Sequence, residues 1–227
     1  MTNRAAPAQS TFDDAGSVDI AARSVSEQDN MAYLLVDRAT GEALLIDAAD
    51  RAEQLQEMLA ETAERAERRG DPRPRIVRIL TTHKHWDHYR ALAETAARTG
   101  AETLAGAADA DELPVCPDRR LEHGDTVELG ATTLRVIALR GHTPGSVALA
   151  LVPPDGPPRL FTGDSLFPGG VGNTGGDAER FAGLLRDVEE RVFACYPDET
   201  IVYPGHGAPT TLGAERPQLP EWRARGW

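Results

Sequence analysis

The sequence predicts a single α/β or α+β domain, for three reasons. Short apolar runs typical of strands occur in both halves of the chain. Each half also contains a run with helical spacing, so each can form a sheet with a flanking helix. Hydrophobic residues make up 41% of the 227 residues, which is enough for a buried core. Residues 1–17 are polar and small, so we expect a flexible tail there and one domain over 18–227.

The first half of the chain is expected to contain two strands, a helix, a strand and a second helix. The strands are short apolar runs, and the first helix alternates apolar and charged residues at helical spacing. Gly70 and Gly100 follow the two helices, where glycine commonly ends a helix. In order, the elements are strands at 31–36 and 43–46, a helix at 51–69, a strand at 76–81 and a helix at 88–99.

The second half of the chain is expected to be richer in strands. Gly130 and the Pro-Pro-Asp-Gly stretch at 153–156 mark turns between apolar runs. A third amphipathic helix follows before the last strand. In order, the elements are strands at 126–129, 133–139, 146–152 and 159–162, a helix at 179–194 and a strand at 200–203.

Charge and composition exclude several classes of partner. With 24 basic and 36 acidic residues, the net charge is −12, so we expect no nucleic-acid partner. No run approaches the roughly 18 apolar residues of a membrane span, and the N-terminus lacks the apolar segment of a signal peptide. Cys116 and Cys195 lie far apart without metal-type spacing. We therefore expect a cytoplasmic protein with no membrane partner.

One short segment, Thr-His-Lys-His-Trp-Asp-His at 82–88, contains four potential metal ligands between a predicted strand and a predicted helix. Imidazole nitrogen and carboxylate oxygen both bind zinc and similar divalent ions. His83 and His85 are two residues apart, so they point to the same side of an extended segment. Asp87 and His88 fall where the chain turns into the helix, which directs them elsewhere. The segment can therefore supply ligands to two neighbouring metals.

Three further candidate ligands each follow a predicted strand. His142 lies in Gly-His-Thr-Pro-Gly-Ser, Asp164 in Thr-Gly-Asp-Ser and His206 in Pro-Gly-His-Gly. The neighbouring glycines allow the backbone to approach a site closely. Five of the six histidines thus belong to these segments, and His123 is expected to be an exposed turn residue outside the site.

These motifs resemble the metallo-β-lactamase-fold hydrolases, whose signature is His-x-His-x-Asp-His followed by separate His, Asp and His positions. Within them the sequence most resembles the short, single-domain glyoxalase II-like (hydroxyacylglutathione hydrolase-like) branch. The resemblance implies an αββα sandwich of two mixed sheets with helices outside. By that resemblance the first metal is held by His83, His85 and His142, the second by Asp87, His88 and His206, and Asp164 bridges both.

The resemblance also implies an activity, a cofactor and a substrate class. Two divalent ions are expected, zinc above all, with iron or manganese as alternatives. Metal-bound hydroxide would attack the carbonyl of a small thioester or ester, and Asp87 could orient that hydroxide as a catalytic residue. The ions with Asp87, Asp164 and hydroxide keep about one positive charge, which suits an anionic substrate. The protein is expected to act as a monomer or a homodimer.

Two departures from glyoxalase II concern the substrate. Asn173 stands where that family usually has an arginine that helps to hold glutathione, so Asn173 becomes a candidate substrate-binding residue. Only 21 residues follow His206, so we expect this chain to lack the helical C-terminal domain that glyoxalase II uses for glutathione. We expect Trp86 to pack beside the metal site.

Three other functions remain open at this stage. The first is a mononuclear iron persulfide dioxygenase of the same fold, in which His83, His142 and Asp164 would form the two-histidine, one-carboxylate triad. The second is hydrolysis of a lactone or a β-lactam by the same site. The third is a metal-binding protein without activity, which the intact set of seven ligand positions disfavours.

Overall fold

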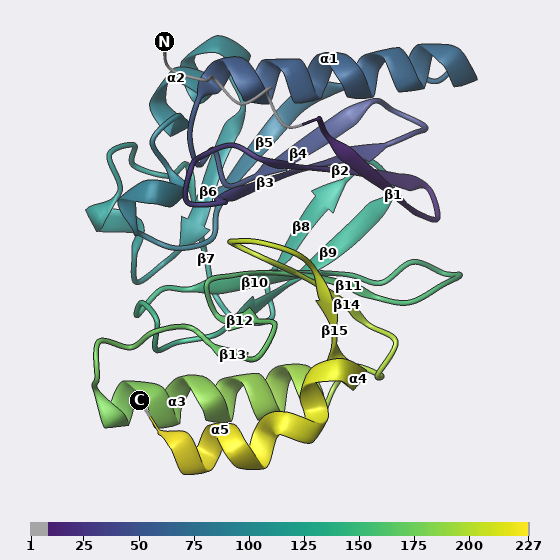
Figure 1. The fold of residues 1–227 in the computed structure, drawn as a ribbon. Helices are drawn as coiled ribbons and strands as arrows, with labels where there is room; N and C mark the ends of the chain where they lie inside the picture. The colour runs from purple at the N-terminus through teal and green to yellow at the C-terminus, as the bar shows by residue number, and fades with distance from the viewer. Residues whose placement is uncertain (1–8, 227) are drawn as a thin grey trace, which may run out of the picture.

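The computed structural model describes residues 9–226, and it contains two sheets packed face to face with helices on both outer sides (Figure 1). This is the αββα sandwich that the sequence resemblance implied. The first sheet has the strand order β1 to β7, and the second has the order β15-β14-β11-β10-β9-β8. A two-stranded ribbon, β12 with β13, lies beside them.

The first sheet uses the N-terminal half of the chain and mixes both pairing directions. Neighbours from β1 to β4 run antiparallel, whereas β4 to β7 run parallel. Helices α1 (Ala52–Arg69) and α2 (Leu92–Thr99) cover its outer face. The strands are β1 (Thr11–Ala15), β2 (Val18–Ser24), β3 (Met31–Asp37), β4 (Glu42–Ile46), β5 (Arg75–Thr81), β6 (Glu102–Gly106) and β7 (Arg119–Leu121).

The second sheet uses the C-terminal half, and α3 (Ala178–Val188) and α5 (Leu219–Arg225) cover its outer face (Figure 1). A short helix, α4 (Leu212–Glu215), precedes α5. The strands are β8 (Thr126–Leu129), β9 (Thr132–Ala138), β10 (Val147–Leu151), β11 (Arg159–Gly163), β12 (Leu166–Phe167), β13 (Gly170–Val171), β14 (Ile201–Pro204) and β15 (Thr210–Thr211).

Successive side chains of the central strands point to opposite faces of the sheet, and apolar residues on both faces form the core. In β3, Leu35 points between the two sheets, whereas Leu34 points to the cluster under α1. Tyr33 and Phe161, from different sheets, meet edge to face at a centroid distance of 5.3 Å. Because both faces are buried, such strands read as continuous apolar runs, which is how the sequence located β3, β4 and β5.

Most predicted elements are confirmed, with two corrections to the helices. The predicted helix at 88–99 is wrong at its start: residues 86–88 form a 3₁₀ turn and α2 begins at Leu92. The backbone N–H of Ala91 donates to the carbonyl of Ala48 at 3.0 Å, so the intervening chain is tied to another loop. The helix predicted at 179–194 ends as α3 at Val188 and continues as a π-helical turn to Phe193. Strands β2, β6, β7, β12, β13 and β15 and helices α4 and α5 were not predicted.

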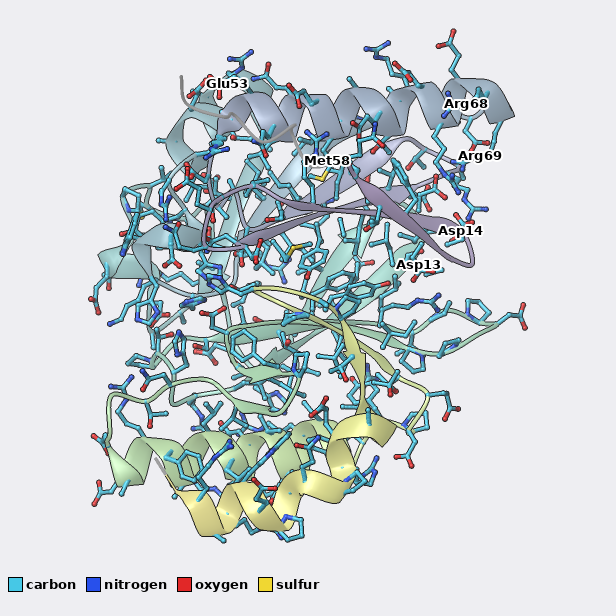
Figure 2. All side chains as sticks on the ribbon, viewed as in Figure 1. Asp13, Asp14, Glu53, Met58, Arg68 and Arg69 are labelled. Atoms are coloured by element: carbon cyan, nitrogen blue, oxygen red, sulfur yellow. The ribbon has the colours of Figure 1, made fainter. Side chains whose placement is uncertain are left out.

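The predicted flexible tail is wrong for Thr11–Ala15, which form β1 and pair with β2. Asp13 accepts hydrogen bonds from Arg159 at 3.0 Å and from the Tyr203 hydroxyl at 2.8 Å. Asp14 accepts one from Arg38 at 3.0 Å. Figure 2 shows both aspartates below the end of α1 that carries Arg68 and Arg69. Charged side chains therefore fix this strand to both sheets; the rest of the tail, 1–8, lies outside the described residues.

No helix within residues 9–226 combines the length and the apolar character needed to cross a membrane.

Candidate metal centre

The structure brings all seven predicted ligand side chains together at one edge of the sandwich. The segment that begins at His83 directly follows β5 in the first sheet. His142 follows β9, Asp164 follows β11 and His206 follows β14, all in the second sheet. Residues up to 123 positions apart in the sequence thus meet where strand ends from both sheets converge, between His83 and His206.

The first half of the site is the three-histidine group, His83, His85 and His142. Each offers a ring nitrogen, and these atoms lie within 4.8 Å of one another. The rings pack edge to face, with centroids 4.8 Å apart for His83 and His142 and 4.5 Å apart for His85 and His142. This arrangement can hold one cation through three imidazoles.

The second half is the Asp87 group, Asp87, His88 and His206, whose ligand atoms also lie within 4.8 Å of one another. The Nε2 atoms of His88 and His206 are 3.2 Å apart. Whereas His88 is fully buried, Asp87 and His206 are partly exposed. This half therefore faces solvent more than the three-histidine group does.

Asp164 lies between the two halves. Its carboxylate is 3.4 Å from His88 Nε2, 3.6 Å from His142 Nε2 and 3.5 Å from His206 Nε2. Gly205 and Gly172 pack against Asp164, and a Cβ at either position would overlap its side chain or its carbonyl. The geometry thus gives Asp164 access to both halves, as a bridging ligand requires.

The nitrogen and oxygen atoms of the seven candidate ligands are suited to metal ions. Among the described residues, the buried Nε2 atoms of His83 and His142 have no hydrogen-bond partner. Leaving a buried polar atom unpaired costs free energy, and a cation between these nitrogens would satisfy both. Three nitrogens and shared carboxylate oxygens are also the ligand types that zinc and iron accept.

Hydrogen bonds to the opposite ring nitrogen fix how three of the histidines point. His142 Nδ1 donates to the carbonyl of Asn173 at 2.7 Å, and His206 Nδ1 donates to that of Gln28 at 2.8 Å. His88 Nδ1 donates to the carboxylate of Asp47 at 2.9 Å. Each bond directs Nε2 into the site and selects the tautomer that binds a metal.

The two halves differ in their electrostatics. Burial lowers the pKa of His83 well below its usual value, and it lowers the pKa of His85 and of His142. Those imidazoles are therefore uncharged at neutral pH and ready to bind a cation. Burial also opposes charge on His88, but Asp47 and Asp164 outweigh it and raise its pKa to about 10.

Asp47 is a functional residue that the sequence analysis missed. It is buried at the end of β4, and its carboxylate also accepts the Thr82 backbone N–H at 2.7 Å and the Thr82 hydroxyl at 2.8 Å. Its backbone is left-handed, with φ 57°. The available signal in the sequence was an acidic residue directly after the buried strand β4. Because β4 pairs with β5, this residue lies next to the ligand segment that follows β5.

Asn30 is a second residue that the sequence analysis missed. It is fully buried, and its Nδ2 donates to the Asp87 carboxylate at 3.0 Å and lies 3.2 Å from His206 Nε2. A backbone bridge pairs Asn30 with His206, and the N–H of Met31 donates to the carbonyl of Gly205 at 2.8 Å. Nothing in the local sequence distinguishes this asparagine.

Asn173 contacts the site through its backbone. Its carbonyl accepts the bond from His142, while its exposed side chain accepts the Gly175 N–H at 2.7 Å. Gly172 packs on the His142 ring, where a Cβ would lie 3.2 Å from Cγ. The glycine-rich loop therefore supports a ligand, and substrate binding by Asn173 stays a prediction.

Trp86 does not pack as expected. Its side chain is 62% exposed, and the Arg90 guanidinium lies 3.9 Å from the ring centroid. Arg90 is itself paired with Asp50 at 2.8 Å. The expectation that Trp86 packs beside the metal site is thus wrong, because this aromatic surface faces solvent.

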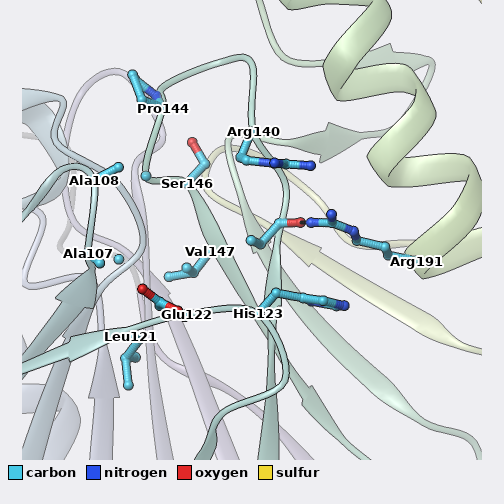
Figure 3. A pocket seen from close by; sticks show the side chains of 13 residues that line it. Ala107, Ala108, Leu121, Glu122, His123, Arg140, Pro144, Ser146, Val147 and Arg191 are labelled. Atoms are coloured by element: carbon cyan, nitrogen blue, oxygen red, sulfur yellow. Dashed lines mark hydrogen bonds between the residues drawn. The ribbon is translucent and has the colours of Figure 1, made fainter.

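A pocket of about 300 Å³ lies beside the site and shares Pro144 and Gly145 with the loop of His142 (Figure 3). None of the seven predicted ligands lines it. Figure 3 shows Arg140 and Arg191 on its opposite side, and both pair with Asp187, at 2.9 and 3.3 Å. His123 lines this pocket; it is an exposed turn residue, as expected, and belongs to none of the ligand groups.

The chain is similar in sequence to a known family and to several of its members. The model of the metallo-beta-lactamase superfamily matches residues 27–206. A hydroxyacylglutathione hydrolase of Fuscovulum blasticum is 38% identical over 181 residues, which cover 79% of this chain and 63% of that protein. A hydroxyacylglutathione hydrolase-like protein of Mus musculus is 35% identical over 79% of this chain and 58% of its own length. The chain thus spans less than two thirds of these relatives.

The chain is also similar to solved structures. ETHE1 from Myxococcus xanthus is 29% identical, with a TM-score of 0.70 over 96% of this chain and 85% of that one. A protein crystallised in a di-iron-bound form is 30% identical, with a TM-score of 0.66 over 86% of this chain and 96% of that one. With the family model matching most of its length and the αββα fold in place, the chain belongs to the metallo-beta-lactamase superfamily.

Proposed function

We propose that the chain is a metal-dependent hydrolase with a dinuclear centre that cleaves a small thioester. The observation that carries this proposal is the position of Asp164, within 3.6 Å of ligand nitrogens from both groups. In the proposal, the three-histidine group holds the first cation, the Asp87 group holds the second, and Asp164 bridges them. Zinc is the proposed metal, and the di-iron form of a structural neighbour supports iron as an alternative to test.

When bound, such cations would make hydroxide available near neutral pH and polarise a carbonyl oxygen. Asp87 is the proposed catalytic residue, because its carboxylate is partly exposed and held in place by Asn30. From there it can orient the attacking water through a carboxylate oxygen. A thiolate leaves without a dedicated general acid, so a thioester suits a site that contains histidine and aspartate ligands alone.

The proposed substrate class is a hydroxyacyl thioester. The names of the curated relatives support it, since they are hydroxyacylglutathione hydrolases at 35–38% identity. Asn173 is the proposed contact for the thiol portion, because its exposed side chain lies in the loop that supports His142. We propose that the protein needs no macromolecular partner for this activity, and that it acts as a monomer or homodimer.

The proposal is tested with His85→Ala and a matched control, His123→Ala. Loss of one ligand of the three-histidine group should remove about one zinc per chain and lower kcat/KM for a hydroxyacyl thioester by more than about a hundredfold. His123 is exposed and outside the site, so its variant should keep both. Metal content by mass spectrometry and thioester hydrolysis provide the readouts.

A fully loaded, fully active His85→Ala protein would overturn the proposal. A wider panel of acyl-thiols, lactones, β-lactams and persulfides separates the alternatives. One iron per chain with oxygen uptake on a persulfide indicates a dioxygenase, and hydrolysis confined to lactones or β-lactams indicates those substrate classes instead.

A further inference from the structure

Asp109 is a fully buried carboxylate that the proposed chemistry does not use. It follows β6, in the loop that leads to the short 3₁₀ turn at 110–112. Its Oδ2 accepts the Lys84 backbone N–H at 3.0 Å and the Thr143 hydroxyl at 2.5 Å, and its Oδ1 accepts the Gly145 N–H at 2.8 Å. All three donors are neutral groups.

These donors belong to the two loops that carry the three-histidine group. Lys84 lies between His83 and His85, and Thr143 directly follows His142. The approach is close enough that a Cβ on Gly145 would overlap Asp109. One carboxylate therefore joins a ligand loop of the first sheet to a ligand loop of the second.

Asp109 forms no ion pair among residues 9–226: no side-chain nitrogen of a lysine, arginine or histidine lies within 4.0 Å of its oxygens. Burying a carboxylate without a counter-charge is costly, even with three hydrogen bonds. A cation held by the neighbouring histidines would supply positive charge next to these loops.

We propose that Asp109 is a positioning residue that assembles the three-histidine group before a metal binds, so that metal affinity at this group depends on it. The inference rests on the proposed metal centre. It does not depend on which substrate is cleaved, because Asp109 is buried and touches backbone and a hydroxyl rather than the reacting atoms.

Asp109→Asn tests this role because it keeps size and removes one acceptor. The two oxygens face different backbone N–H groups, of Lys84 and of Gly145. Whichever way the asparagine amide is placed, its NH₂ opposes one of those donors. Either placement removes a hydrogen bond between Asp109 and one of the ligand loops, which weakens the link between the two loops.

Asp37→Asn is the matched control. Asp37 is also buried, and it likewise accepts a backbone N–H and a threonine hydroxyl, both from Thr40, at 2.9 and 2.8 Å. It is the last residue of β3, directly before the turn to β4, away from the ligand loops. Oδ1 of Asp37 accepts both bonds, so an asparagine can keep them, and this control removes a buried carboxylate charge away from the ligand loops.

The experiment measures the two stepwise zinc affinities by chelator competition, together with the unfolding temperature of the metal-free proteins. In Asp109→Asn, one step should weaken about 10- to 100-fold while the other changes by less than about threefold. In Asp37→Asn, both steps should stay at wild-type values. Co²⁺ loading should show an altered visible absorption spectrum for Asp109→Asn alone.

Wild-type zinc affinities in Asp109→Asn, or losses equal to those of Asp37→Asn, would refute the role. If Asp109→Asn does not fold, Thr143→Val removes one of the three donors and should weaken the same step by a smaller factor. A wild-type protein that binds fewer than two zinc ions contradicts the proposed dinuclear function instead, and the single remaining step still tests Asp109.

Discussion

The two halves of the candidate site are each supported by one buried aspartate, but in different ways. Asp109 bonds to the backbone of the loops behind the three-histidine group and touches no ligand side chain. Asp47 bonds directly to the Nδ1 of a ligand in the Asp87 group, His88. One carboxylate therefore sets where ligands are placed, and the other sets the tautomer and basicity of a ligand.

The two halves of the site also differ in the charge of their histidines. In the three-histidine group His83 and His142 are buried, and burial lowers the pKa of all three imidazoles, whereas the pKa of His88 is raised by Asp47 and Asp164 against the effect of burial. Asp47 and Asp109 add two carboxylates to the wall of the site. They offset the single positive charge expected from the ligand set alone, so a positively charged site is not a sufficient argument for an anionic substrate.

The largest effect is expected from Asp47→Asn, which tests whether the two aspartates act on separate halves of the site. An asparagine at 47 can still accept from Thr82, but it no longer provides the negative charge that holds a proton on His88 Nδ1. Zinc affinity of the Asp87 group should fall about 10- to 100-fold, with little change at the three-histidine group. Stepwise chelator competition checks this. An equal loss in both steps would show that Asp47 acts on the whole site.

A smaller effect is expected from Asn30→Leu, which tests a second supporting residue of the Asp87 group. The change removes the bond from Nδ2 to the Asp87 carboxylate but keeps a side chain of similar size. We expect about tenfold weaker zinc binding at this group and a lower kcat, with KM nearly unchanged. Asn30→Gln offers a longer amide for rescue. A variant whose KM rises while kcat is unchanged would place Asn30 in substrate binding instead.

The smallest effect concerns stability away from the site and is measured on the metal-free protein. Burial raises the pKa of Asp13, but hydrogen bonds from Arg159 and Tyr203 outweigh it, so the pKa is lowered on folding. The stabilisation is therefore present above the unfolded pKa of about 3.9 and is lost as pH falls through the folded pKa. Asp13→Asn should lower the free energy of unfolding by about 1 kcal/mol at pH 7 and by less below pH 4.

Urea titrations of both proteins at several pH values check this expectation. No further control variant is needed, because the pH dependence itself distinguishes loss of the carboxylate charge from a general loss of packing. A deficit that is constant from pH 3 to pH 7 would show that the charge of Asp13 contributes nothing.

Sequence alone located the seven candidate ligands because they are chemically distinctive and follow apolar strands that are easy to recognise. The supporting residues lacked both properties. Asn30 and Asp47 are common residue types in loops, and their partners lie 57 and 41 residues away. Such contacts depend on the order of strands within the first sheet, which no local pattern encodes.

The errors in the fold have a similar origin. The sequence of β1, Thr-Phe-Asp-Asp-Ala, has only a weak strand pattern, and its stability comes from pairing with β2 and from Arg159, 146 residues from Asp13. The late start of α2 follows from tertiary hydrogen bonds of Ala91 rather than from helix propensity. In both places long-range contacts outweigh the local signal.

The convergence of strand ends from both sheets has a consequence for folding. The three-histidine group takes His83 and His85 from the first sheet and His142 from the second, and the Asp87 group likewise draws on both, through His88 and His206. Each cation in the proposed centre would thus act as a cross-link between the two layers. Metal supply and the cooperativity of unfolding would then be linked by mass action, so a chelator would loosen the sandwich as well as stop the reaction.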